Sequence, residues 1–114
     1  MRKHNFAFID IETTGLNILK HEIIEVGCVL ATPELEVIEE FELKIKPEHI
    51  ENSDPVSLKI SHYEKENWKN AHTLEEAMKI LSEKTRKIEI FTVEISGPSR
   101  PDHHPKTFKT SLGV

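Results

Sequence analysis

Two carboxylates, Asp10 and Glu12, stand two positions apart in the largely apolar segment FAFIDIETTGL, residues 6–16. In a β-strand, residues at i and i+2 project from the same face, with Cα atoms roughly 7 Å apart. Two carboxylates so placed can share divalent cations, because hard ions such as Mg²⁺ prefer oxygen ligands. From this pair alone, a strand end that reaches solvent is the alternative interpretation, since unpaired buried carboxylates are costly.

The strand that positions this pair is predicted at residues 5–12. Apolar side chains occur on both of its faces, with Ala7 and Ile9 on one face and Phe6 and Phe8 on the other. A strand that is apolar on both sides is typical of the middle of a sheet. We therefore expect the carboxylates to lie on a central strand.

Two more strands are predicted at residues 22–31 and 36–46, joined by a short turn. Short connections of this kind indicate a three-stranded antiparallel meander. The third strand has a polar face with Glu40, Glu42 and Lys44, which suits the edge of a sheet, where a protein partner could pair with it. Its inward-facing residues are expected to be Val37, Phe41, Leu43 and Ile45.

Helical patterns follow the meander. Asp54 before Pro55 is a good N-cap and first position for a short helix. Thr73 and Glu76 have the spacing of a capping box at the start of a second helix. The apolar stripe of this second helix comprises Leu74, Ala77, Met78 and Leu81. After this helix, a fourth strand is predicted at residues 87–95.

The chain of 114 residues is long enough for one small domain, assigned to residues 1–95. Residues 96–114 contain three prolines and two glycines, which predicts a disordered tail. No apolar run approaches the roughly 20 residues of a membrane span. The single cysteine, Cys28, lies in an apolar run and is expected to be buried. Because one cysteine cannot form a disulfide within the chain, a cytoplasmic location is expected.

The charge is unevenly distributed along the chain. Residues 1–84 carry 10 Lys and Arg against 17 Asp and Glu, whereas residues 85–114 carry 5 against 3. An acidic body does not attract nucleic acid through a general basic field. Any polyanion that this chain binds must therefore be held locally, for which divalent metal is the obvious means.

Asp10, Glu12, Thr14, Gly15 and Leu16 form the pattern D-x-E followed by T-G-hydrophobic, with Thr13 between. Together with the downstream segments HEIIEVGCV, IKP and LEEA, this pattern resembles the first motif of the DEDD-type 3′→5′ exonucleases. The resemblance covers residues 5–84. It implies an α/β ribonuclease H-like exonuclease fold, here incomplete, and hydrolysis at the 3′ end of single-stranded DNA or RNA.

The resemblance also implies site roles. Asp10 and Glu12 would be catalytic ligands of two Mg²⁺ or Mn²⁺ ions, with Asp10 bridging both and Glu12 holding the ion that generates the attacking hydroxide. Thr13 and Gly15 would offer backbone groups to the terminal nucleotide, and Leu16 would wedge against its base. For these three residues, a turn followed by a core leucine is the alternative.

The later motifs of the resembled family, a His-Asn…Phe-Asp segment and a His followed by Asp, have no counterpart in residues 95–114. Because two carboxylates supply only part of the ligands that two metal ions need, we expect impaired activity. A catalytically inactive fragment that binds nucleic acid or protein is the alternative function. A frameshift, a truncation or a fragment would all account for the altered ending.

Other polar residues have competing interpretations. Glu25 either lines the site from the second strand or forms a structural ion pair. His62 is expected at the surface rather than beside the substrate, and Trp68 is expected in the core rather than stacking on a base. His103 and His104, flanked by prolines, are expected to be solvated rather than to bind metal.

Overall fold

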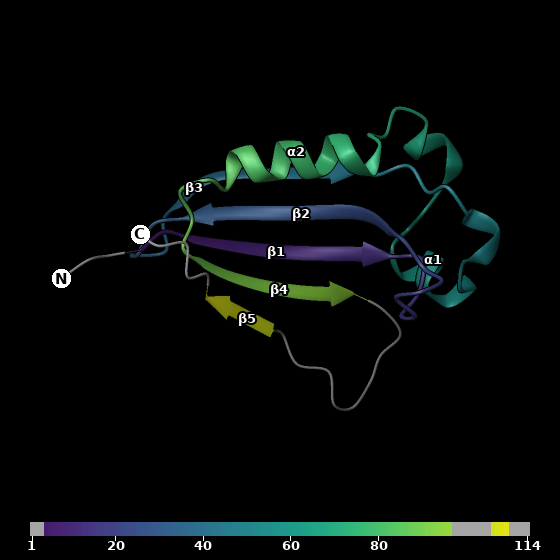
Figure 1. Cartoon of the computed structure of the whole chain (residues 1–114), viewed down its shortest axis with the longest axis horizontal. Helices are drawn as coiled ribbons and strands as arrows, with labels where there is room; N and C mark the ends of the chain where they lie inside the picture. Colours follow the sequence, from purple (N-terminus) through teal and green to yellow (C-terminus); the bar gives the residue numbers. More distant parts are fainter. Residues whose placement is uncertain (1–3, 97–105, 110–114) are drawn as a thin grey trace.

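Strand β1 (Phe6–Thr13) lies in the middle of a mixed sheet in the computed structural model, which describes residues 4–96 and 106–109. The strand order is β3-β2-β1-β4-β5 (Figure 1). The expected central position of the strand that carries Asp10 and Glu12 is confirmed. The other strands are β2 (Ile23–Ala31), β3 (Val37–Lys44), β4 (Ile90–Ser96) and β5 (Lys106–Lys109).

The first three strands form the expected antiparallel meander, and β4 returns to pair with β1 in parallel. A parallel pair requires a crossover, and α2 (Leu74–Lys84) lies within that connection. Figure 1 shows α2 along one face of the sheet. This arrangement is the α/β fold predicted from the sequence.

Side-chain caps fix where both helices begin. Asp54 accepts a hydrogen bond from the backbone N–H of Val56 at the start of α1 (Pro55–Ile60), with Pro55 in the first turn. Thr73 and Glu76 form the predicted reciprocal capping box, with bonds of 2.9 and 3.1 Å. Two short 3₁₀ segments, Ile50–Asn52 and Lys65–Trp68, connect these elements.

The hydrophobic core lies between α2 and one face of the sheet. Ala7 and Ile9 of β1 and Ala77 of α2 are buried in it. On the other face of β1, Phe8 is 38% exposed and Asp10 is also exposed. We call this second face the open face, because the helix that covers the core leaves it accessible. The remaining buried core residues are Val26, Cys28, Leu30, Leu43, Ile45 and Ile88.

The structure differs from the sequence predictions at both ends of the core. Val37, expected to face inward, is 62% exposed, because the register of β2 and β3 shifts between Leu30 and Ala31. Leu74, expected in the apolar stripe of α2, is 52% exposed at the first position of the helix. No helix in the described part of the chain is long and apolar enough to cross a membrane.

The predicted tail, residues 96–114, falls mostly outside the described residues. Within it, Lys106–Lys109 pairs antiparallel with β4 as strand β5. This strand differs from the disorder predicted for these residues. Pairing with β4 provides hydrogen-bond partners for the backbone of β5. A segment of four residues is too short for its sequence pattern to predict this pairing.

Candidate active site

Three rows of side chains cross the open face, because residues that pair across a sheet point to the same side. The Phe8 row joins Phe8 to Val29 and Glu40 on one side and to Thr92 on the other. The Asp10 row and the Glu12 row follow at two-residue steps along β1. They comprise Glu42, Gly27, Asp10 and Glu94, and then Lys44, Glu25 and Glu12.

The Asp10 row places carboxylates on three strands. Asp10 pairs with Glu94 on the parallel strand β4 and, on its other side, with Gly27, which is itself paired with Glu42. A Cβ built on Gly27 would have the backbone oxygen of Asp10 as its nearest neighbour, at 3.9 Å. Gly27 thus leaves a gap in the row between the side chains of Asp10 and Glu42.

A cavity of about 650 Å³ lies over the Phe8 and Asp10 rows. Its lining combines the apolar side chains of Phe8 and Val29 with the carboxylates of Asp10, Glu42 and Glu94. An aromatic face beside carboxylates can accommodate a flat polar group together with a cation. The remaining lining residues are Ile9, Gly27, Cys28, Glu40, Phe41 and Thr92.

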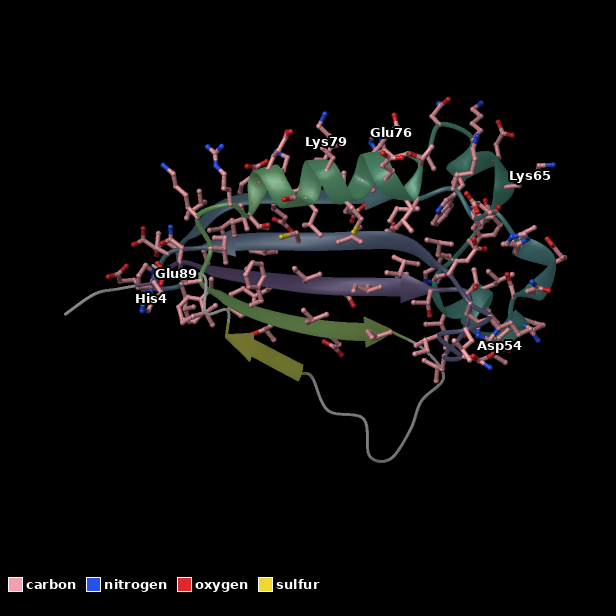
Figure 2. The ribbon with its side chains drawn as sticks, in the orientation of Figure 1. His4, Asp54, Lys65, Glu76, Lys79 and Glu89 are labelled. Atoms are coloured by element: carbon pink, nitrogen blue, oxygen red, sulfur yellow. The ribbon has the colours of Figure 1, made fainter. Side chains whose placement is uncertain are left out.

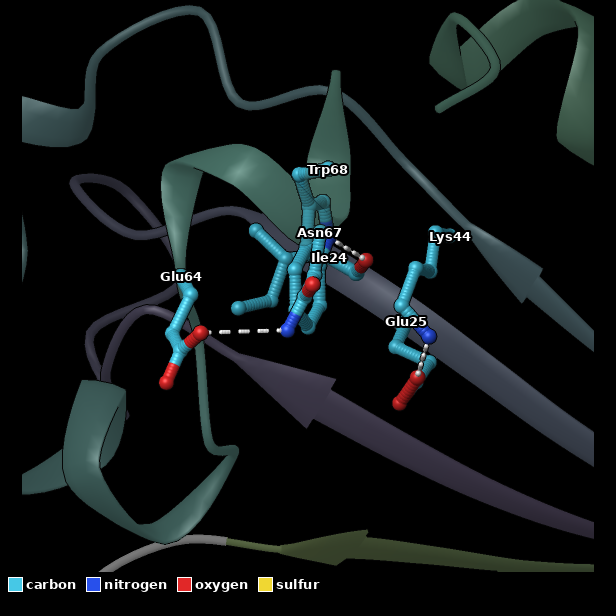
Figure 3. A network of polar contacts seen from close by, with 6 residues as sticks. All are labelled: Ile24, Glu25, Lys44, Glu64, Asn67 and Trp68. Carbon is cyan, nitrogen blue, oxygen red and sulfur yellow. Dashed lines mark hydrogen bonds and ion pairs between the residues drawn. The ribbon is translucent and has the colours of Figure 1, made fainter. Parts of the chain in front are cut away.

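In the Glu12 row, Glu25 forms an ion pair with Lys44, with 3.2 Å between Nζ and Oε2 (Figure 3). Glu25 is also the cross-strand partner of Glu12. The structural ion pair expected for Glu25 is therefore confirmed, whereas its role in lining the predicted site stays a prediction. The Lys44 ammonium offsets part of the repulsion between two carboxylates that face one another on neighbouring strands.

The loop after β1 is held by its own hydrogen bonds. The Thr13 hydroxyl donates to the Gly15 carbonyl at 2.7 Å, and the Asn17 N–H donates to His21 Nδ1 at 3.0 Å. The His21 ring packs on Gly15 so closely that a Cβ built there would lie 2.2 Å from Nδ1. Leu16 is 36% exposed. Gly15 is therefore needed for contact with His21, a reason that the sequence analysis did not identify.

The structure separates the predicted site residues. Thr13 and Gly15 line a second, more apolar cavity of about 740 Å³, together with Ile23, Leu74 and Ile95. Asp10 lines the cavity over the open face instead. The cause is strand alternation, which turns Thr13 away from the face that carries Asp10 and Glu12. The predicted contacts of Thr13, Gly15 and Leu16 with a nucleotide stay predictions.

Among the described residues, no group of three or more His, Cys, Asp or Glu side chains has the geometry of a metal site. Asp10 and Glu12 nevertheless share one face of β1, and their donor oxygens suit a hard cation. Mg²⁺ in proteins is often held by one or two carboxylates with water and substrate phosphate completing its shell. The residues present thus fit one hydrated ion.

The sequence pattern does not reveal that Glu42 and Glu94 share a row with Asp10. The register of the β2–β3 hairpin would have been sufficient to predict Glu42 in the Asp10 row. Glu94 could not be predicted there, because it is brought beside Asp10 by the parallel pairing of β4 with β1.

Trp68 is buried as expected, with its indole N–H donating to the Ile24 carbonyl at 2.8 Å. His62 is exposed, as predicted.

Cys28 is buried as predicted, and burial raises the pKa of its thiol to about 11, with the nearby Glu39 adding to the effect. A thiol with so high a pKa is protonated at neutral pH and is a poor nucleophile or metal ligand. Cys28 therefore belongs to the core. His103 and His104 lie outside the described residues.

Comparisons with known proteins agree on one type of fold. The family model described as "RNase_T: Exonuclease" matches residues 7–97. A structure of a full-length 3′-exonuclease matches with a TM-score of 0.65 and 19% identity, over 85% of this chain and 48% of that one. No curated protein matches the sequence.

Two further solved structures match in the same way. One, described as 3′-end-specific recognition of histone mRNA stem-loop by 3′-exonuclease, has a TM-score of 0.65 and 20% identity, over 84% of this chain and 37% of that one. The other is the nuclease domain of 3′hExo, a DEDDh family member bound to rAMP, with a TM-score of 0.64 and 20% identity, over 83% and 52%. The chain thus spans between about a third and a half of the length of these proteins.

Proposed function

The chain belongs to the RNase_T exonuclease family, and on that premise we propose that it acts in the hydrolysis of phosphodiester bonds at the 3′ end of a nucleic acid. The observation that carries this proposal is the placement of Asp10 and Glu12. They lie two residues apart on a central strand, on the sheet face that α2 does not cover. Substrate can therefore reach both carboxylates without displacing the core.

Asp10 and Glu12 are the proposed ligands of a divalent ion, Mg²⁺ or Mn²⁺. Such an ion, when bound, would polarise the scissile phosphate and lower the pKa of a bound water. The protein supplies a fixed backbone for both carboxylates, because β1 is paired along its length with β2 and β4. Pairing on both sides limits the movement of the two ligands relative to each other.

The substrate is proposed to be a single strand of DNA or RNA with a free 3′ end. Two matched structures, one of 3′-end-specific recognition of a histone mRNA stem-loop and one of a nuclease domain bound to rAMP, support a 3′-terminal nucleotide as the bound group. Leu16, partly exposed after β1, is proposed to contact the terminal base, and the backbone of Thr13 and Gly15 to contact its sugar and phosphate. A preference between DNA and RNA depends on contacts to the 2′-hydroxyl.

We propose further that this chain carries out the reaction slowly. A two-metal mechanism needs more anionic ligands than Asp10 and Glu12 supply, and Glu25 in the same row is already paired with Lys44. Glu42 and Glu94 lie in the Asp10 row, but among the described residues no three such side chains are grouped closely enough to hold a metal ion. Weak occupancy by a second ion would lower the rate without preventing binding of the strand. We therefore expect both a low affinity for the metal ion and a low turnover rate.

The test measures metal binding and strand cleavage on the same proteins. Isothermal titration with Mn²⁺ is expected to give weak binding that Asp10→Asn and Glu12→Gln abolish. Glu75→Gln, which removes an exposed carboxylate on α2, is the matched control and should bind like the parent chain. A strand labelled at its 5′ end should shorten stepwise from its 3′ end, and a blocked 3′ end should prevent this. Equal cleavage by Asp10→Asn would refute the assignment.

A second function, a non-catalytic binding module, is favoured by the free side of the edge strand. Among the strands that the structure describes, β3 is the last of the sheet on its side, and Val37 and Ile38 at its start are 62% and 53% exposed. A partner strand could pair there through main-chain hydrogen bonds. Partner binding that Val37→Pro removes, in a chain without any cleavage activity, would favour this function over hydrolysis.

A further inference from the structure

The strand positions of the open face are strongly acidic. The three rows carry six carboxylates and, among the side chains that the structure describes there, a single cation, Lys44. Lys44 is therefore the described side chain of these rows whose charge attracts a phosphate. The carboxylates are Asp10, Glu12, Glu25, Glu40, Glu42 and Glu94.

Lys44 is held in place by two contacts. Its Nζ lies 3.2 Å from Glu25 Oε2 and 4.9 Å from the centre of the Trp68 ring. Trp68 is itself fixed, because it is buried and its indole N–H donates to the carbonyl of Ile24 at 2.8 Å. Figure 3 shows Lys44 and Glu25 side by side, with Trp68 hydrogen-bonded to Ile24, the neighbour of Glu25 on β2. These two contacts favour one position of the Lys44 ammonium.

That position lies beside the proposed metal ligands. Lys44, Glu25 and Glu12 pair across three adjacent strands, which are spaced about 4.8 Å apart. A lysine side chain has three N–H donors and no acceptor, so one donor can face Glu25 while others face solvent. The Lys44 side chain is 35% exposed, so it is partly in contact with solvent.

We propose that Lys44 binds a backbone phosphate of the substrate strand, next to the phosphate that is cleaved. This inference rests on the proposed function, which places the scissile phosphate at Asp10 and Glu12. Glu25 and Trp68 act as positioning residues, because they hold the ammonium over the Glu12 row. A phosphate at Lys44 would set the strand along this row, from the edge strand β3 toward β1.

The experiment measures binding of a fluorescein-labelled, phosphorothioate-linked oligothymidylate by anisotropy, with Mn²⁺ present, over a range of salt concentrations. Lys44→Met removes the charge and keeps an unbranched stem over Trp68. Each neutralised phosphate of a single strand contributes a slope of about 0.7 to the fall of log affinity with log salt. Lys44→Met should lower the slope by that amount and weaken binding roughly fivefold at about 0.1 M salt.

Lys79→Met is the matched control, because Lys79 is an exposed lysine on α2, pointing away from the sheet (Figure 2). It should bind like the parent chain, and Lys44→Arg should restore both affinity and slope. If Lys44→Met has the slope of Lys79→Met while the parent chain binds the strand, the inference is wrong and the proposed function stands. If the parent chain does not bind the strand at all, both fail. A purely structural role would lower the melting temperature of Lys44→Met and leave the slope unchanged.

Discussion

Gly15→Ala tests how the loop after β1 is built. An alanine Cβ at this position would lie 2.2 Å from Nδ1 and 2.6 Å from Cγ of His21. Since Cγ is attached directly to the Cβ of His21, a small rotation of the ring cannot relieve the overlap. The whole side chain must move, and the hydrogen bond from the Asn17 N–H to Nδ1 is then lost.

The expected cost is the sum of two effects. Overpacking of a close contact typically costs about 1–3 kcal/mol. The lost hydrogen bond adds roughly 0.5–1.5 kcal/mol, at the low end because the Asn17 N–H is exposed and can bond to water. We therefore expect Gly15→Ala to lower the free energy of unfolding by about 2 kcal/mol, within the range that these two effects define.

Urea denaturation followed by tryptophan fluorescence measures this loss, because Trp68 is buried and is the chain's one tryptophan. The second arm is His21→Ala, alone and combined with Gly15→Ala. If the His21 ring is the obstacle, alanine at position 15 should cost little in the His21→Ala background, and the two changes should couple by more than about 1 kcal/mol. Equal losses from Gly15→Ala in both backgrounds would show that the contact with His21 is not what requires glycine.

Three other predictions follow from single contacts. Thr73→Ala should cost about 1 kcal/mol of unfolding free energy in urea melts. The hydrogen bond from the Thr73 N–H lowers the pKa of the Glu76 carboxyl. The stabilisation from this N–H bond is therefore present above the ordinary carboxyl pKa and lost as the pH falls through the lowered value. Trp68→Phe should cost about 1–2 kcal/mol, since the Ile24 carbonyl loses a buried donor but keeps the N–H of Ile45. Burial raises the pKa of Cys28 to about 11, so Ellman's reagent should react with its thiol in urea and not in the folded chain at neutral pH; rapid reaction of the folded chain would contradict this.

Local patterns in the sequence predicted the meander, the caps and the face of the acids. Alternation placed Asp10 and Glu12 on the same face of their strand, apolar residues on both faces predicted its central position, and the spacing of Thr73 and Glu76 predicted the capping box. The resemblance to DEDD-type exonucleases, based on the first motif, is confirmed by the family match. These features depend on residues close in sequence, where periodicity and capping chemistry are reliable guides.

Features that depend on distant contacts could not be read from the sequence. The register shift after Leu30 turns Val37 outward. Glu39 interrupts the alternation of this strand in the sequence, but the direction in which Val37 then points depends on the pairing with β2. The parallel pairing of β4 brings Glu94 beside Asp10, which requires knowledge of the crossover. The packing of His21 on Gly15 is likewise a contact between side chain and backbone across a turn. The metal ligands, the nucleotide contacts and the cytoplasmic location stay predictions.

The parallel pair of β1 and β4 also constrains the order in which the chain can fold. Phe6 pairs with Ile90, so nearly the whole described chain separates the two strands that must meet. During synthesis, β1, β2 and β3 emerge first and can pair through short turns, whereas β1 must wait for its second neighbour. Until β4 arrives, one side of β1 presents an unpaired row of N–H and C=O groups, so ribosome-bound chains that end before Ile90 should be the most prone to aggregate.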